Sequence, residues 1–304
     1  MRAETRRLLL PHLLLAALVY AIVCLPKSRP NVESATALLV GLALFEGAFL
    51  AAARRARGRE TGAYDIIALV WALLLAWELA APVCNIAHPV LVPPPENVFH
   101  TFRLQWRVML LNIGYSMGLL AAGFTTGLVL AVLLGLPCAW LPRLRRVTYP
   151  IANVMAPIPP VVISPYLVAL MPSFRSASML VIVLGVFWPT FLTTINRVGA
   201  IEPQILDAAR TLEPSTPVML FRILLPYVLP GIVSGLKVSM TTSLLMLNFA
   251  ELMGATHGMG YYVQNSIAYA NYAHAVAGIL VIGAVVTVLS AAVTWLQGHL
   301  IRWQ

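Results

Sequence analysis

The sequence predicts an all-α polytopic membrane protein with about eight transmembrane helices. Apolar residues make up 60% of the 304 residues and charged residues only 10%, whereas soluble domains average roughly 45–50% and 25%. The apolar residues gather in runs of about the length that a helix needs to cross a bilayer. The basic residues lie mostly between these runs. The net charge of +9 therefore favours the positive-inside rule of membrane proteins over nucleic-acid binding.

Residues 1–60 are predicted to form an additional N-terminal hairpin of two transmembrane helices. The first span covers residues 8–25. A signal peptide is the alternative, but this run is long for one, and Leu25-Pro26-Lys27 lacks the small residues of a cleavage site. The second span, residues 35–53, contains Glu46, which is costly in lipid when ionised. We expect a protonated carboxyl or a paired helix–helix contact there, although the neighbouring sequence offers no partner.

Residues 61–304 are predicted to form the main transmembrane domain. Its first span covers residues 65–86, and an amphipathic segment at 97–109 leads into a long apolar helix that ends near residue 141. The next span, residues 149–170, has too many prolines for an unbroken helix. Irregular backbone within a membrane must face protein or a water-lined cavity. Three of these prolines are therefore candidates for lining a substrate pathway, namely Pro157, Pro159 and Pro160.

The last three predicted spans cover residues 179–195, 228–249 and 273–296, with a Gly-rich, re-entrant-looking stretch before the final one. Two charged residues in this part are further pathway candidates. Lys237 lies within an apolar span and either meets an anion or extends to lipid headgroups. Glu251 ends its span beside the Gly-rich stretch, either at the mouth of the pathway or as an ordinary interfacial acid.

Residues 201–226 form the longest segment that is too polar to cross a bilayer. They predict two short helices. Pro203 suits the first turn of the first helix, because its missing N–H would be unpaired there anyway. That helix should end before Pro214, since the residue before a proline is pushed out of the α region.

The second short helix should begin at Pro217, with Thr216 or Ser215 as its N-cap. It should run to about Leu225, where Pro226 would interrupt it. A polar helical hairpin of this size between two apolar spans indicates a docking element for another protein.

The distribution of basic residues predicts that both termini and residues 201–226 lie in the cytoplasm. Eight crossings with this orientation put most arginines on the inner side, as the positive-inside rule requires. The basic residues left on the outer side are Lys27, Arg29, Arg103, Arg107 and Arg175.

The polar segment resembles the EAA signature of bacterial ATP-binding-cassette (ABC) importer permeases, E-A-A-x3-G-x9-I-x-L-P. At the same spacing this chain has Asp207, Ala208, Ala209, Glu213, Ile223 and Pro226. The likeness extends over residues 68–303 and favours the nitrate/sulfonate/taurine/bicarbonate branch, through stretches such as PIANVMAPIPPVVISPYLVAL and AELMGATHGMGYYV. It implies a type I importer permease core (MetI-like), with residues 1–60 as an addition and residues 201–226 as coupling helices.

This resemblance also implies the partners of the chain. They are a cytoplasmic ABC ATPase dimer, a second permease subunit that is expected to be another copy of this chain (a homodimer), a periplasmic or lipid-anchored substrate-binding protein, and the lipid of the bacterial inner membrane. The chain itself would be non-catalytic and carry no cofactor, with ATP and Mg²⁺ on the ATPase. The substrate would be a small organic or inorganic anion such as a sulfonate, taurine or nitrate.

Two residues depart from the family pattern. Asp207 replaces Glu, which keeps the carboxylate but shortens the side chain. Glu213 replaces the Gly that would form an unrestricted turn. We expect Pro214 to break the helix in its place, and Arg210 to pair either with the ATPase or with Glu213.

The sequence lacks signatures that would favour other functions. The lysines, Lys27 and Lys237, follow no G-x-x-x-x-G frame, so no P-loop is present. The three cysteines are scattered, and neither a metal site nor a disulfide is expected. A stand-alone secondary transporter or channel is the alternative function, but it would leave the cytoplasmic hairpin without a role. A membrane-embedded enzyme would need clustered catalytic side chains.

Overall fold

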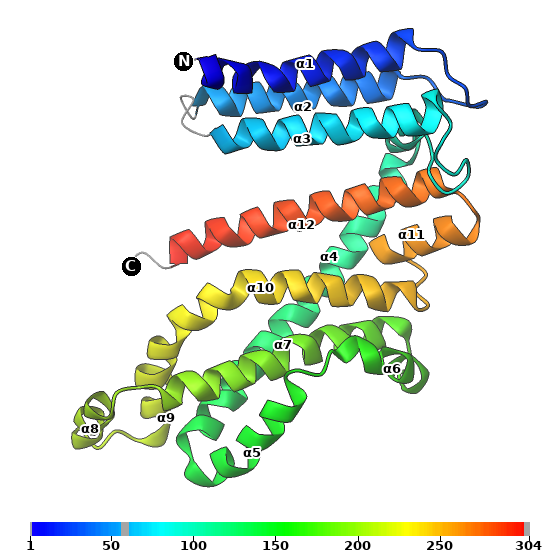
Figure 1. The fold of residues 1–304 in the computed structure, drawn as a ribbon. Helices are drawn as coiled ribbons and strands as arrows, with labels where there is room; N and C mark the ends of the chain where they lie inside the picture. Colours follow the sequence, from blue (N-terminus) through cyan, green and yellow to red (C-terminus); the bar gives the residue numbers. More distant parts are fainter. Residues whose placement is uncertain (1, 56–60, 301–304) are drawn as a thin grey trace. The chain divides into compact units, whose positions relative to one another are not determined.

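A computed structural model describes residues 2–55 and 61–300, and all regular structure within these ranges is helical (Figure 1). The first half of the chain contains α1 (Arg2–Cys24), α2 (Thr36–Arg55), α3 (Thr61–Glu78), the π-helical η1 (Leu79–Val83), α4 (Pro95–Trp140), α5 (Pro142–Met155), the 3₁₀-helical η2 (Pro160–Ile163) and α6 (Ser164–Leu170). The second half contains α7 (Phe174–Gly199), α8 (Pro203–Thr211), α9 (Thr216–Val218), the π-helical η3 (Met219–Leu224), α10 (Leu225–Leu252), α11 (Met259–Ala268) and α12 (Tyr272–Leu300).

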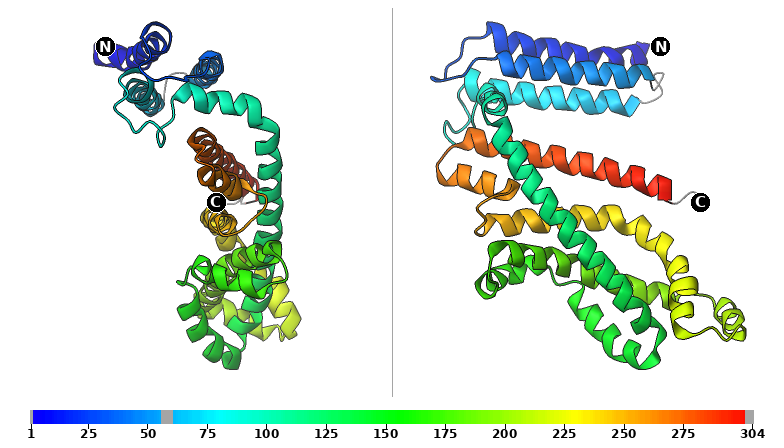
Figure 2. Two further views of the ribbon diagram at one scale, coloured as in Figure 1. Left: turned by 90° about the vertical axis from the view of Figure 1, so that its right-hand side faces the viewer. Right: turned by 180° about the vertical axis from the view of Figure 1, so that it is seen from behind.

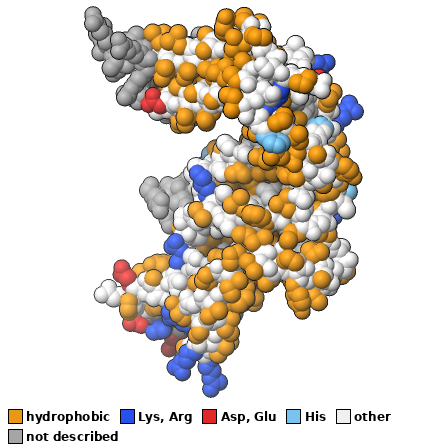
Figure 3. All heavy atoms as spheres, turned by 45° about the vertical axis from the view of Figure 1, so that its right-hand side comes forward, with side chains coloured by type: hydrophobic (Ala, Val, Ile, Leu, Met, Phe, Trp, Pro, Cys, Tyr) orange, Lys and Arg blue, Asp and Glu red, His pale blue; other side chains and the backbone are white. Residues whose placement is uncertain are grey.

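The predicted class, an all-helical membrane protein, is confirmed. Within the described ranges, six helical segments are long and apolar enough to cross a membrane, or up to seven if the bent pair α5 and α6 counts as one span. The apolar part of α1, Leu9–Cys24, is shorter than the others. The number of about eight crossings therefore stays a prediction. On the face shown in Figure 3, hydrophobic side chains cover wide areas, as expected for a surface in contact with lipid.

The chain divides into two compact units, of which the first comprises residues 1–109 and 263–280. Helices α1, α2 and α3 lie side by side in it (Figure 2). They share one core, formed by Leu18, Ile22, Leu38, Leu42, Ile67 and Trp71. The predicted domain boundary at residue 60 is thus crossed by a continuous core, because α3 packs with the N-terminal hairpin. The assignment of residues 1–60 as an addition to the permease stays a prediction.

Ionic contacts join the loop after α1 to α3 and α4 within this unit. The Lys27 ammonium contacts the carboxylate of Glu78 and lies 2.8 Å from Glu96 Oε1. Burial lowers the pKa of Lys27, but hydrogen bonds to the two carboxylates and their negative charge outweigh it, so the pKa lies above its ordinary value. Arg29 is buried as well and donates to Asn85 Oδ1 and the Val92 carbonyl at 2.8 and 2.6 Å. The N-terminal hairpin of α1 and α2 is therefore held by ionic contacts to α3 and α4 as well as by apolar packing.

The mid-span Glu46 has a partner that the sequence did not reveal. Nδ1 of His12, in α1, lies 2.8 Å from Glu46 Oε1 in α2. The sequence predicted either a protonated carboxyl or a paired helix–helix contact at Glu46, and the structure shows the paired contact.

The second unit comprises residues 110–262 and 281–304. One of its cores joins α4, α5, α7, α8 and η3, through residues such as Leu136, Ala152, Ile195, Ala209 and Leu224. The predicted interruption of the proline-rich span is confirmed, since α5 and the segment from Pro160 to Leu170 are bent by 80° at a short break. Residues 97–109 and the long apolar helix that was predicted to follow them belong to one continuous helix, α4.

The prediction that Pro226 interrupts the second short helix was also wrong. The chain stays helical from Thr216 to Leu252, and Pro226 lies in the first turn of α10. The π-helical η3 precedes it, and the Leu225 N–H bonds to the Leu220 carbonyl, five residues back. A π turn of this kind inserts an extra residue into the helix, and the first turn of a helix tolerates a residue that lacks an N–H.

Candidate functional site

Helix α8 carries the first half of the candidate coupling site and is anchored on one face. Pro203 occupies its first turn, as predicted. Ala209 is buried, and Leu206 packs beside it against the same core. Asp207 and Ala208 lie on the opposite, exposed face. A short helix fixed in this way can transmit force between a docked partner and the spans.

The charges on α8 pair with each other. Arg210 Nη1 lies 3.2 Å from Asp207 Oδ1, with both side chains largely exposed. The guanidinium of Arg210 also lies over the Trp140 ring, 5.4 Å from its centroid. Of the two expected partners of Arg210, Glu213 is replaced by Asp207, and pairing with the ATPase stays a prediction. An exposed pair contributes little to stability, so both groups are available to a partner at small cost.

The corner between the two short helices adopts a strained backbone at Glu213. Its φ is +45°, in the left-handed region that glycine occupies without cost and other residues rarely adopt. The Glu213 N–H bonds to the Arg210 carbonyl at 2.9 Å, which closes the last turn. The first helix ends before Pro214, as predicted. The turn keeps the glycine-like geometry, although the residue is Glu.

The second half of the site is formed by α9 and η3. Ser215 is the N-cap residue, but its side chain makes no capping hydrogen bond. Ile223 packs against the core, whereas Pro226 is exposed. Across residues 201–226 as a whole, four large apolar side chains are exposed, with exposed fractions of 42% for Ile205, 78% for Leu212, 37% for Val218 and 47% for Phe221.

The predicted pathway residues do not form one cluster. Pro157 and Pro159 are exposed at the break between α5 and η2, whereas Pro160 is buried. Pro160 packs near Gly185 of α7, where an added Cβ would lie 3.7 Å from its ring. Lys237 is exposed on α10.

Glu251 is buried and holds the start of α11. Its exposed fraction is 1%. Oε1 accepts a hydrogen bond from Ser116 at 2.6 Å, and Oε2 accepts one from the Gly260 N–H at 2.8 Å. Asn112 Oδ1 accepts from the Gly258 N–H at 2.7 Å, and Ser116 Oγ accepts from the Met259 N–H at 2.9 Å. These side chains satisfy N–H groups that a helix start leaves unpaired, so we call Asn112, Ser116 and Glu251 the α11 latch.

The glycines of the preceding stretch are what let Glu251 approach. Gly258 has φ +121°, and an added Cβ would lie 2.3 Å from Glu251 Cδ. The sequence indicated a re-entrant stretch from these glycines but missed Asn112 and Ser116. Their one available signal was two polar residues four positions apart in an apolar helix, which places them on one face.

Among the described residues, no group of three or more His, Cys, Asp or Glu side chains could hold a metal ion. The three cysteines are free thiols. The candidate site is an exposed helical hairpin on a multi-span bundle.

Comparison with known proteins gives the family. The model of the binding-protein-dependent transport system inner membrane component family matches residues 123–304, more than half of the chain, and the chain belongs to this family. It is 24% identical to the putative aliphatic sulfonates transport permease protein SsuC of Bacillus subtilis, over 83% of this chain and 92% of that protein. It is 26% identical to the taurine transport system permease protein TauC of Escherichia coli, over 76% and 86%.

A solved structure supports the fold. The MetNI methionine ABC transporter in an inward-facing conformation is similar with a TM-score of 0.51 and 17% identity, covering 67% of this chain and 97% of that one. The predicted family and its ABC-permease fold are confirmed. The chain is a membrane-spanning permease subunit of an ABC transporter.

Proposed function

We propose that residues 201–226 dock a cytoplasmic ABC ATPase dimer, and that the chain forms half of a pathway that imports a small organic or inorganic anion. The observation that carries the docking role is the exposed hairpin with its signature spacing. The coupling residues are Asp207, Ala208, Ala209, Arg210, Glu213, Pro214, Ile223 and Pro226.

The exposed apolar side chains of the hairpin support a protein partner. Leu212 lies in the loop before the apolar segment Thr216–Leu252, Phe221 lies near the start of that segment, and both side chains are exposed. Covering apolar surface contributes about 25 cal/mol per Å². Asp207 and Arg210 add exposed charged groups to the same hairpin, and protein interfaces ordinarily combine apolar and polar groups.

The anchoring of the hairpin supports the coupling role. Ala209 and Leu224 share one core with Ile195 of α7, so displacement of the docked hairpin displaces α7 and α10 with it. Closure of the ATPase dimer would thus move the spans as a rigid body. ATP and Mg²⁺ would bind to the ATPase, because this chain has no P-loop, and the chain would remain non-catalytic.

The pathway would form between this chain and a second permease subunit, which we propose is another copy. The broken span has exposed apolar residues on both sides of the break, including Val154, Val162 and Tyr166. Pro157 and Pro159 would line the pathway beside them, whereas Pro160 is buried near α7 and would hold the break in place. A periplasmic or lipid-anchored binding protein would deliver the substrate, with both termini of the chain in the cytoplasm and the protein in the bacterial inner membrane.

The substrate class rests on the relatives and on one cation. Relatives are named for aliphatic sulfonates, taurine and, in Synechococcus elongatus, bicarbonate. All carry a negative oxygen-rich group. Lys237 exposes an ammonium on α10 that an anion could contact, and Glu251 would shape the pathway indirectly by holding α11.

Reconstitution into vesicles tests the proposal. The chain would be assayed with its co-expressed ATPase and binding protein, with radiolabelled taurine, an alkanesulfonate, nitrate or bicarbonate outside. ATP-dependent uptake that needs all three components is expected, and Lys237→Met should reduce it. Uptake by this chain alone, independent of ATP, would instead establish a stand-alone transporter.

A further inference from the structure

An open apolar groove lies between α2 and the first turns of α4, within the first unit. Its volume is about 560 Å³, which falls in the usual range for small-molecule sites, about 300–1,000 Å³. The walls include Val40 and Leu44 of α2 and Phe99, Phe102 and Arg103 of α4. Arg103 is the charged side chain among the lining residues, so the groove is an apolar channel with a cation at its edge.

The shape of the groove depends on a glycine. A Cβ at Gly41 would lie 2.8 Å from Cε1 of Phe99, so the absence of a side chain lets the Phe99 ring pack directly on α2. Val40 and Leu44 remain 59% and 70% exposed. They belong to a segment apolar enough to span the membrane, so the occupant must itself be apolar along this wall.

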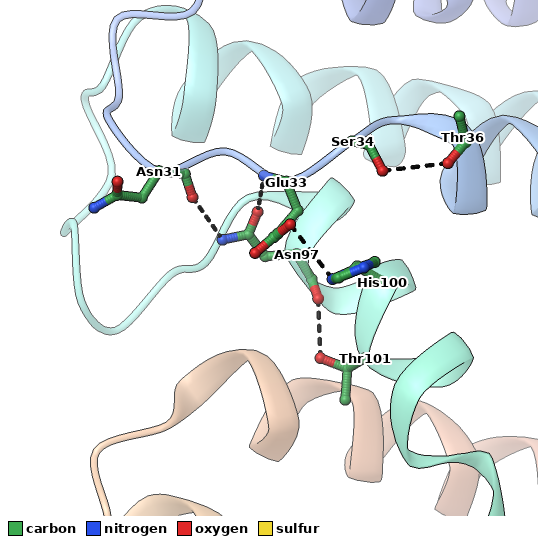
Figure 4. A network of polar contacts seen from close by, with 7 residues as sticks. All are labelled: Asn31, Glu33, Ser34, Thr36, Asn97, His100 and Thr101. Atoms are coloured by element: carbon green, nitrogen blue, oxygen red, sulfur yellow. Dashed lines mark hydrogen bonds and ion pairs between the residues drawn. The ribbon is translucent and has the colours of Figure 1, made fainter.

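A polar network holds the two walls together next to the groove (Figure 4). The Glu33 N–H donates to Asn97 Oδ1 at 2.9 Å, and Asn97 Nδ2 donates to the Asn31 carbonyl at 3.2 Å. His100 Nδ1 lies 3.6 Å from Glu33 Oε2. These contacts tie the segment before α2 to the first turns of α4, so the groove is a built feature and not a gap between loose helices.

The charges at the groove favour an anion at headgroup depth. Arg103 is exposed, and its guanidinium has no hydrogen bond or ion pair with the described residues. One turn further on, Arg107 lies 5.2 Å from the centroid of the Trp106 ring. Tryptophan and long basic side chains gather where a membrane protein meets lipid headgroups. The nearby Glu33 faces His100, so no acidic group faces Arg103 from the groove lining.

We propose that this groove binds an anionic phospholipid. One acyl chain lies along Val40, Leu44, Phe99 and Phe102, and the phosphate accepts charge-assisted hydrogen bonds from Arg103. A soluble anion would leave the apolar walls uncovered, whereas a lipid satisfies both the walls and the cation. The bound lipid would support the junction of the N-terminal hairpin with α4, a role separate from the transported substrate.

Native mass spectrometry of the full-length chain, released from nanodiscs of phosphatidylglycerol and phosphatidylcholine, tests this site. The wild type should retain phosphatidylglycerol preferentially. Arg103→Gln should reduce that retention about tenfold, because it removes the charge-assisted hydrogen bonds to the phosphate. Arg175→Gln is the matched control, because Arg175 is exposed on the same predicted side but does not line the groove.

A second pair of variants tests the apolar walls. Val40→Trp should fill the groove and displace the lipid, whereas Ala43→Trp on an exposed position of the same helix should not. Retention that is equal for both lipids, or unchanged in Arg103→Gln and Val40→Trp, would overturn the proposal. A change of oligomeric state caused by Val40→Trp alone would also overturn it, by showing that a second copy occupies the groove.

Discussion

Two corners of this chain carry carboxylates in opposite environments. At the α11 latch, Glu251 is buried and both of its oxygens accept hydrogen bonds from the same chain. At the hairpin corner, Asp207 and Glu213 are exposed, and the backbone of Glu213 is strained. In the α11 latch, Gly258 is glycine at the position where the close approach of Glu251 requires it. At the hairpin corner, Glu213 stands where the family signature has glycine. The polar groups of one corner are paired within the chain, whereas the other corner leaves its carboxylates exposed, as the proposed docking role requires.

The largest expected effect comes from Gly258→Ala in the latch. The new Cβ would overlap Glu251 Cδ, and φ of +121° disfavours any L side chain. We expect a loss of about 3 kcal/mol or more in unfolding free energy, measured as thermal unfolding in detergent. Gly283→Ala is the control, because a Cβ there meets nothing within 4 Å. Equal stability of the two variants would contradict the described latch.

Glu251→Gln should have a smaller effect on the same corner. The amide can accept from Ser116, but its NH₂ group would then face the Gly260 N–H, donor against donor. We expect a cost of about 1–3 kcal/mol, with increased hydrogen exchange at the start of α11. Glu202→Gln, on an exposed residue, should leave both measurements unchanged. An unprotected α11 start in the wild type would argue against the latch.

Charge reversal at the hairpin should affect the partner and not the fold. Asp207→Lys removes the exposed pair with Arg210, and Glu213→Lys reverses the charge of the corner. Each should weaken ATPase copurification about tenfold, in line with the loss of one charged contact, with thermal unfolding of the chain unchanged. Asp65→Lys, on an exposed residue outside the hairpin, makes the same change of total charge and is the control. Undiminished copurification in both hairpin variants would separate this corner from coupling.

The smallest expected effect is a gain. Glu213→Gly should relieve the positive φ and stabilise the chain by about 1 kcal/mol, seen as a slightly higher melting temperature. Glu213→Ala removes the same charge without relieving the backbone, so it should show no gain. If both variants behave alike, the side chain and not the backbone determines the stability of the corner.

Local rules in the sequence predicted much of this protein. Hydropathy predicted the long apolar helices, proline density predicted the break before η2, and Pro203 marked the start of α8, while the crossing by residues 8–25 stays a prediction. The signature spacing predicted the family. These features depend on neighbouring residues in the chain, on helix length and on backbone chemistry. They can therefore be predicted without knowledge of the tertiary structure.

The tertiary structure alone decided which polar groups meet. Ser116 and Glu251 are 135 positions apart, and neither His12 with Glu46 nor Lys27 with Glu78 follows a local pattern. The tertiary structure also decided that the π-helical η3 continues the helix past Pro226 and that the backbone of Glu213 has a positive φ. The physical reason is that a buried polar group needs some partner, and the packing of distant helices selects which one.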